Sequence, residues 1–295
     1  MENILFEKTP VPKAYMKLAL PVVLSMLVSL VYNMVDTYFI ALTGVQELVA
    51  GVSLVVPIFT MMIAFGDIFG LGGSSVISRL FGEKRDAEAK RVSAFCIWAA
   101  VIFGICITIL FLLFKGQILG ILGADEKTLQ YADAYYTWIV LGAVFIIFGL
   151  VPSNILRTEG LAAQAMTGSI IGSVINIILD PVMIYGIGPC PEMGVKGAAY
   201  ATVIGQVASA VLLLIFHIKF NKEFEHGAKY MKPDGGIIKE IYTIGLPAII
   251  AQALMSIMVY VMNLILKFNP SAQTAYGLFY KVQQFVLFLA FGLRD

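Results

Sequence analysis

The chain has 295 residues, of which 59% are hydrophobic and 13% are charged, and its formal net charge is +1. A soluble domain carries about 25% charged residues, and the mean hydropathy here is +0.88. No water-soluble fold can bury this much apolar surface, so the composition predicts a protein that crosses a membrane several times. The net charge gives no indication of a nucleic-acid partner, and none is expected.

Eight apolar segments follow one another along the chain, each long enough to cross a bilayer as a helix. They cover residues 14–42, 48–77, 92–114, 134–156, 165–187, 197–220, 238–266 and 272–293. Strands of an outer-membrane barrel alternate in hydropathy over about ten residues, and these segments do not alternate. The sequence therefore predicts an all-α integral membrane protein whose partners include the lipid bilayer.

The first segment carries a carboxylate, Asp36, about two-thirds of the way along the run LALPVVLSMLVSLVYNMVDTYFIAL at residues 18–42. Asn33 lies about one helical turn before it. Pro21, near the start, removes a backbone hydrogen bond and can bend the helix. A charge at this depth is costly and usually binds or relays something. The alternative is a structural carboxylate that is hydrogen-bonded between helices.

Basic residues gather on one side of the predicted membrane. Fourteen Lys and Arg residues fall in the N-terminal stretch and the even-numbered loops, against four on the other side. Such loops remain on the cytoplasmic side. We therefore expect a cytoplasmic N-terminus, and the N-terminal stretch shows no signal-peptide pattern.

An internal repeat appears when the chain is shifted by 226 residues. Leu20-Pro21 then aligns with Leu246-Pro247, and the triplet AFG at 64–66 aligns with the AFG at 290–292. An offset of six segments preserves orientation, so this is a parallel repeat, as in some secondary transporters. We expect a six-helix N-terminal lobe followed by the first two helices of a second lobe. Because that second copy holds only two segments, we expect the chain to be truncated relative to a twelve-helix parent.

The predicted domain boundaries follow from the repeat and from the longest polar stretch. They are a six-helix transmembrane lobe at residues 1–218, a cytoplasmic linker at 219–237 and a partial second lobe at 238–295.

A second polar cluster occurs in the fifth segment, in the run NIILDPVMIYG. Asn176 and Asp180 are four residues apart and share one helix face. Pro181 leaves the carbonyl group of Ile177 without its usual helical donor. These groups form an oxygen-only set that suits Na⁺ or a proton. The alternative is an Asn–Asp pair that caps or packs a broken helix.

The sixth segment begins GVKGAAYATVIGQ, and Ala198 and Thr202 are again four residues apart. Thr202 can add a hydroxyl oxygen to the same cavity, although small residues here also favour close helix packing. We expect Asp36, Asn176 and Asp180 to meet in one cavity within the first six helices, because each lowers the cost of burying the others.

Enzyme chemistry is not indicated. The sequence has no nucleophile–base set, no Walker motif and no metal-type spacing among its three cysteines. No cofactor or catalytic residue is therefore predicted. The 13 methionines and 12% aromatic residues suit a promiscuous apolar cavity, although most must face lipid or neighbouring helices.

The chain resembles the multidrug and toxic compound extrusion (MATE) family of prokaryotic efflux transporters. The matching motifs are LALPVVLSMLVSLVYNMVDTYFIA, GLGGSSVISRLFGEKR, NILRTEG, NIILDPVMIYGIG, GVKGAAYAT and IGLP. The resemblance implies a site for H⁺ or Na⁺ at Asp36, Asn176, Asp180 and Thr202, with the backbone carbonyl of Ala198. It also implies that helix bends at Pro21 and Pro181 take part in the transport cycle.

By this resemblance, the expected function is secondary active efflux of organic cations or amphipathic drugs in exchange for H⁺ or Na⁺, by alternating access. The expected location is the plasma (inner) membrane of a prokaryote, with several membrane passes and no obligate protein partner. Two alternatives are a flippase for lipid-linked oligosaccharides, which shares the superfamily architecture, and an inactive fragment.

Overall fold

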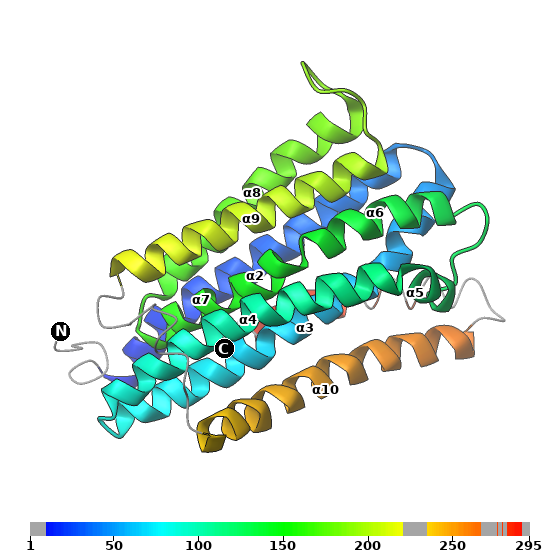
Figure 1. The fold of residues 1–295 in the computed structure, drawn as a ribbon. Helices are drawn as coiled ribbons and strands as arrows, with labels where there is room; N and C mark the ends of the chain where they lie inside the picture. Colours follow the sequence, from blue (N-terminus) through cyan, green and yellow to red (C-terminus); the bar gives the residue numbers. More distant parts are fainter. Residues whose placement is uncertain (1–9, 221–234, 267–275, 277–278, 280–281, 291–295) are drawn as a thin grey trace.

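The computed structural model describes residues 10–220, 235–266, 276, 279 and 282–290, and all regular secondary structure among them is helical (Figure 1). The labels follow Figure 1. The helices are α2 (Val11–Leu42), α3 (Gln46–Gly82), α4 (Asp86–Leu113), α5 (Lys115–Ile121), α6 (Leu129–Leu141), α7 (Ala143–Thr158), α8 (Ala162–Tyr185), α9 (Val195–Phe220) and α10 (Gly235–Leu266).

Five of these helices, α2, α3, α4, α8 and α9, are each long and apolar enough to cross a membrane, and the pair α6–α7 forms a sixth span. This confirms the all-α membrane fold and the predicted first six spans. The seventh and eighth apolar segments are only partly described; residues 282–290 are helical.

The fourth span differs from the prediction, because it is two helices bent by 46° and not one continuous helix. The break lies at Gly142, between α6 and α7. A Cβ atom there would lie 2.8 Å from a methyl group of Val203 on α9. Only glycine permits this close approach, and glycine also weakens a helix. The break therefore coincides with a close contact with another helix, which the apolar pattern does not reveal.

Several helices extend beyond the predicted apolar segments. α4 begins at Asp86 and not at residue 92, with Asp86 and Glu88 in its first turn, where acidic side chains interact favourably with the helix dipole. α9 begins at Val195, two residues before its predicted segment, and ends at Phe220 as predicted, and α10 begins at Gly235, three residues before its segment. Helical residues therefore enter both ends of the predicted 219–237 linker. The short helix α5 was not predicted.

The prolines of the repeat occupy similar places. Pro21 lies inside α2 and Pro247 inside α10, and both helices have 32 residues. Pro181 lies inside α8. All three helices continue through their prolines. The second AFG triplet falls partly outside the described residues.

Two glycines allow α8 and α9 to pack closely. The two helices lie side by side (Figure 1) and form the most extensive helix pair of the described residues. A Cβ at Gly172 would lie 2.6 Å from the carbonyl oxygen of Gly205, and a Cβ at Gly205 would lie 2.7 Å from that of Gly172. Small residues of this kind let helix backbones approach in membranes.

We expect Gly205→Ala to lower the melting temperature of the purified chain in detergent. The added methyl group would meet the main chain of α8 and the Cβ of Asn176 at 3.1 Å, and such overpacking costs about 1–3 kcal/mol. Gly116→Ala on α5 is the matched control, because its Cβ would meet nothing within 4 Å. Equal melting temperatures for both variants would contradict the close contact.

The helix α10 packs against α3. A Cβ at Gly72 would lie 2.5 Å from the carbonyl oxygen of Ile241, and one at Gly245 would lie 2.7 Å from Ile68. Both guanidinium amino groups of Arg79 donate to the Glu240 carboxylate. The first helix of the second repeat is thus in contact with the second helix of the first.

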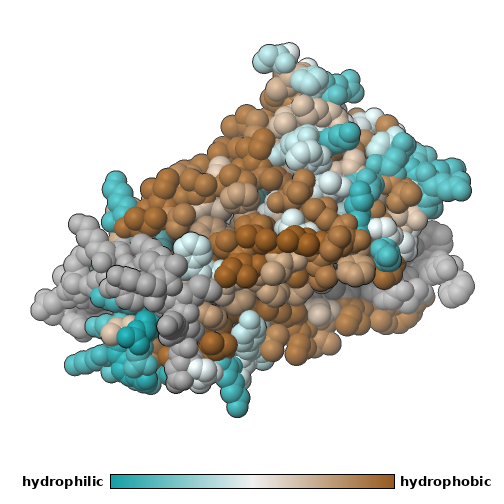
Figure 2. Space-filling model, in the orientation of Figure 1, coloured by the Kyte–Doolittle hydropathy of each residue, from teal (hydrophilic) through white to brown (hydrophobic). Residues whose placement is uncertain are grey.

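Polarity divides the molecule into a belt and two ends. Figure 2 shows hydrophobic residues over the middle of the visible face and hydrophilic residues towards its ends. We call the end with the start of α2 and the α3–α4 turn the basic end. The opposite end, with the α2–α3 turn and the α8–α9 connection, is called the pocket end.

Candidate functional site

The structure brings the two membrane carboxylates together. Asp36 lies on α2 and Asp180 on α8, and these two helices pack against each other. A hydrogen bond joins the two carboxyl groups. Asp180 has no exposed surface. Two carboxyl groups can share such a bond only when one of them carries a proton, because a carboxylate has no donor.

Asn176 connects this pair to α9. The side-chain amide of Asn176 is oriented so that its nitrogen and its oxygen both have hydrogen-bond partners. The nitrogen donates to Asp180 Oδ2 at 3.1 Å, and the oxygen accepts from the main-chain N–H of Thr202 at 3.0 Å. Asn176 is one helical turn before Asp180 and is 2% exposed. Its amide therefore bridges α8 and α9 inside the bundle.

The α9 residues of the predicted set lie on the same side of the cluster. Thr202 is 3% exposed and Ala198 is fully buried one turn before it. The predicted residues Asp36, Asn176, Asp180 and Thr202 are thus linked through hydrogen bonds, with Ala198 beside Thr202. Asn33 is not linked to them: its side chain is exposed and donates to the carbonyl of Ser29.

One oxygen of the cluster has no donor. The Oδ1 atom of Asp36 is buried and lacks a hydrogen-bond partner among the described residues. A buried acceptor without a partner costs about 1–3 kcal/mol, and more when it is charged. A proton or a bound cation at this atom would remove that cost.

Two tyrosines that were not predicted from the sequence also belong to the cluster. Tyr32, one turn before Asp36 on α2, interacts electrostatically with both carboxyl groups. Tyr135 on α6 hydrogen bonds to Thr202 and also interacts with both carboxyl groups. Tyrosine is common in membrane helices, so residue type alone did not distinguish them. The available signal was the i, i+4 spacing of Tyr32 and Asp36 on one helix face.

The cluster presents oxygen ligands, and its two carboxyl groups are placed to share a proton. Carboxylate, amide, hydroxyl and phenol oxygens are the groups that hard cations prefer. On the same helix, the carbonyl group of Ile177 has no intrahelical donor, because Pro181 has no N–H. Chemically, the arrangement can hold either a proton between two carboxyl groups or a monovalent metal ion in its place.

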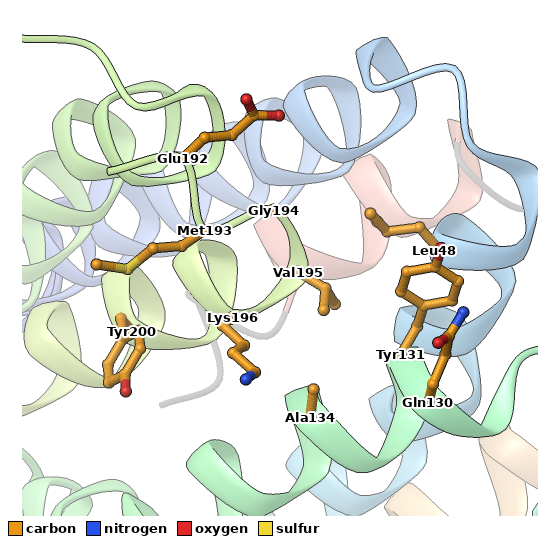
Figure 3. Close-up of a pocket in the computed structure, with 10 residues that line it drawn as sticks. All are labelled: Leu48, Gln130, Tyr131, Ala134, Glu192, Met193, Gly194, Val195, Lys196 and Tyr200. Carbon is orange, nitrogen blue, oxygen red and sulfur yellow. The ribbon is translucent and has the colours of Figure 1, made fainter. Parts of the chain in front are cut away.

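A pocket of about 720 Å³ opens at the pocket end of the bundle. It lies between α6, the start of α3, and the α8–α9 connection with the first turns of α9 (Figure 3). Its lining residues are Leu48, Gln130, Tyr131, Ala134, Glu192, Met193, Gly194, Val195, Lys196 and Tyr200. Figure 3 shows Lys196 reaching from α9 towards α6, whereas the Glu192 carboxylate points away from the other labelled residues.

The pocket lies one to two helical turns from the carboxylate cluster. Tyr131 in the pocket and Tyr135 in the cluster are four residues apart on one face of α6, which is about 6 Å along the axis. Val195 in the pocket and Thr202 in the cluster are seven residues apart, and therefore also share a face of α9. The pocket thus continues the helix faces that carry the cluster.

The fold defines a polytopic membrane protein of the transporter class, with a hydrogen-bonded polar cluster buried inside its first helical bundle. The profile of the family described as MatE matches residues 21–182, which is more than half of the chain. The chain belongs to the MATE family of transporters.

Relatives and solved structures agree with this assignment. The chain is 33% identical over 291 residues to the multidrug export protein MepA of Staphylococcus aureus (strain NCTC 8325 / PS 47), and equally to that of Staphylococcus haemolyticus (strain JCSC1435). The alignments cover 98% of this chain and 64% of the relatives. The chain therefore spans somewhat less than two thirds of their length.

Two crystal structures of a MATE protein are similar in fold. One shows it in the straight conformation, with a TM-score of 0.91, and one in the bent conformation, with a TM-score of 0.88. Both are 27% identical to this chain, and both alignments cover 99% of this chain and 65% of the other. The similarity confirms the predicted N-terminal lobe with part of a second lobe.

Proposed function

We propose that this chain forms the cation-coupled part of a secondary active multidrug efflux transporter that exchanges organic cations or amphipathic drugs for H⁺ or Na⁺. The observation that carries the proposal is the hydrogen-bonded pair Asp36–Asp180 with its bridging amide Asn176. The relatives named as multidrug export proteins support the substrate class. The proposed location is the plasma membrane of a prokaryote.

The coupling step is an exchange at the carboxyl pair. A cation that enters between Asp36 and Asp180 takes the place of the shared proton, which then leaves to water. The two charge states of the pair hold α2 and α8 differently, because a shared proton draws the carboxyl groups together whereas a cation is surrounded by its ligands. Because Pro21 can act as a bend in α2, the parts of the helix before and after it can move separately. Occupancy of the site thereby shifts a two-state equilibrium of the helix.

In this proposal, the coupling ion reaches the cluster from the pocket. The pocket lies at the end opposite the basic loops, which the charge distribution assigns to the outside. Tyr131 and Val195 line the way inward, and Tyr135 and Thr202 receive the ion at the cluster.

Transport in vesicles tests the proposal. Liposomes that contain the chain would be loaded with ethidium, and the loss of ethidium would be followed under an imposed H⁺ or Na⁺ gradient. Liposomes that contain MepA of Staphylococcus aureus provide the positive control. We expect at least one gradient to accelerate efflux. An ethidium efflux rate that is the same with and without each gradient would contradict coupled exchange.

The proposed orientation gives a separate prediction. Cys190 is half-buried in the α8–α9 connection, whereas Cys96 is buried and Cys106 is exposed in the C-terminal half of α4. We expect a membrane-impermeant maleimide to label Cys190 in intact cells and to leave the two α4 cysteines unlabelled in the bilayer. The variant Cys190→Ser should remove the label. Labelling that requires opened cells would reverse the orientation.

A further inference from the structure

The C-terminal end of α2 is hydrogen-bonded from outside the helix. The last four carbonyl groups of a helix have no intrahelical donor, and in α2 these include Phe39, Ile40 and Ala41. The carbonyl of Ile40 accepts from the main chain and side chain of Thr43, and that of Ala41 accepts from Gly44. These local bonds leave the carbonyl of Phe39 to be satisfied from elsewhere.

Tyr185, the last residue of α8, supplies that donor. Its hydroxyl group donates to the carbonyl oxygen of Phe39 at 2.5 Å. The two aromatic rings are also in edge contact, with centroids 6.4 Å apart. This side chain therefore caps α2 from another helix, across 146 residues of sequence.

The tie lies close to the carboxyl pair. Asp36 is three residues before Phe39, and Asp180 is five residues before Tyr185, which correspond to about 4.5 and 7.5 Å along the helix axes. Both helices run from the basic end to the pocket end. The Asp36–Asp180 contact and the Phe39–Tyr185 contact therefore join α2 and α8 one after the other along the helix axes. α2 is held in the bundle mainly through α8. Tyr185 therefore adds a direct tie between α2 and α8 at the outer end of α2, beyond Asp36.

We infer that Tyr185 is a positioning residue of the cation site, which holds the outer end of α2 against α8 so that Asp36 faces Asp180. The inference rests on the proposed function for the presence of a cation at the site, and on the structure for the contact between Tyr185 and Phe39. Without the hydroxyl group, the Phe39 carbonyl loses its donor and the outer half of α2 moves more freely. Part of the binding free energy of the cation is then used to order that helix, which weakens the apparent affinity.

The test compares Tyr185→Phe with Tyr38→Phe. The first keeps the ring and removes only the donor. The second makes the same chemical change at an exposed tyrosine one residue before Phe39. Spin labels on Leu42→Cys and Ile187→Cys, in a chain with Cys106→Ala and Cys190→Ala, report the distance between the outer ends of α2 and α8. Calorimetric titration with NaCl gives the Na⁺ affinity.

We expect Tyr185→Phe to broaden the distance distribution and to weaken Na⁺ binding by about threefold to tenfold, in line with the loss of one hydrogen bond. Tyr38→Phe should match the parent chain in both measurements. An unchanged distance distribution in Tyr185→Phe, or unchanged affinity with a broadened distribution, would overturn the positioning role. If the parent chain binds no Na⁺ and exchanges no proton, the proposed function fails, and the distances still decide whether Tyr185 ties the helices.

Discussion

Asp36→Asn and Asp180→Asn should each abolish the release of protons that follows addition of NaCl to the purified chain. Each should also weaken Na⁺ binding by about tenfold to more than a hundredfold, because interactions with a charged group contribute about 1.5–3 kcal/mol. An amide has nearly the shape of a carboxyl group but cannot exchange a proton. Either substitution therefore removes the shared proton from the site. Proton release can be followed with a pH indicator in weakly buffered detergent solution.

Folding should survive these substitutions. Asn at either position can still donate a hydrogen bond to the remaining carboxylate, so the buried contact is kept while the exchangeable proton is lost. Asp133→Asn is the matched control, because Asp133 pairs with Lys115 outside the cluster. It should leave proton release and Na⁺ affinity unchanged. Normal proton release from both cluster variants would show that the carboxyl pair is not the exchange site.

The membrane spans could be predicted from the sequence because each helix satisfies its own backbone hydrogen bonds in lipid and needs only length and apolar composition. The same reasoning selected Asp36 and Asp180, since an isolated charge in such a segment is conspicuous. Their meeting followed from the cost of leaving each alone. Asn176 and Thr202 depended on helical spacing together with the family resemblance.

Three other features that depend on contacts between helices were not predicted. The break lies at Gly142, where α9 approaches closely through Val203. Tyr135 and Tyr185 act through partners on other helices, Thr202 and the carbonyl of Phe39. A tyrosine in an apolar segment gives no indication of which distant atom it will reach, so hydropathy and periodicity could not identify these residues.

Asn176→Leu tests whether the amide that bridges α8 and α9 contributes to the cation site. Leucine fills a similar volume and removes the amide that bridges Asp180 and the main chain of Thr202. We expect Na⁺ affinity to fall at least about tenfold, by the loss of a bond to a charged group. The melting temperature should also fall, because the buried Asp180 carboxyl group is left without the amide that donates to it, at a cost of about 1–3 kcal/mol.

A double-mutant cycle then shows whether Asn176 acts through Asp180. If the amide serves the site by orienting that carboxyl group, Asn176→Leu should have little further effect on Na⁺ affinity once Asp180→Asn is present. Residues within one hydrogen-bond network typically show coupling free energies of about 0.5–3 kcal/mol. Titration of the two single variants and the double variant, in the same detergent, supplies the measurement. Strictly additive losses would show that Asn176 and Asp180 contribute to cation binding independently, and the shared network would then not be the basis of the site.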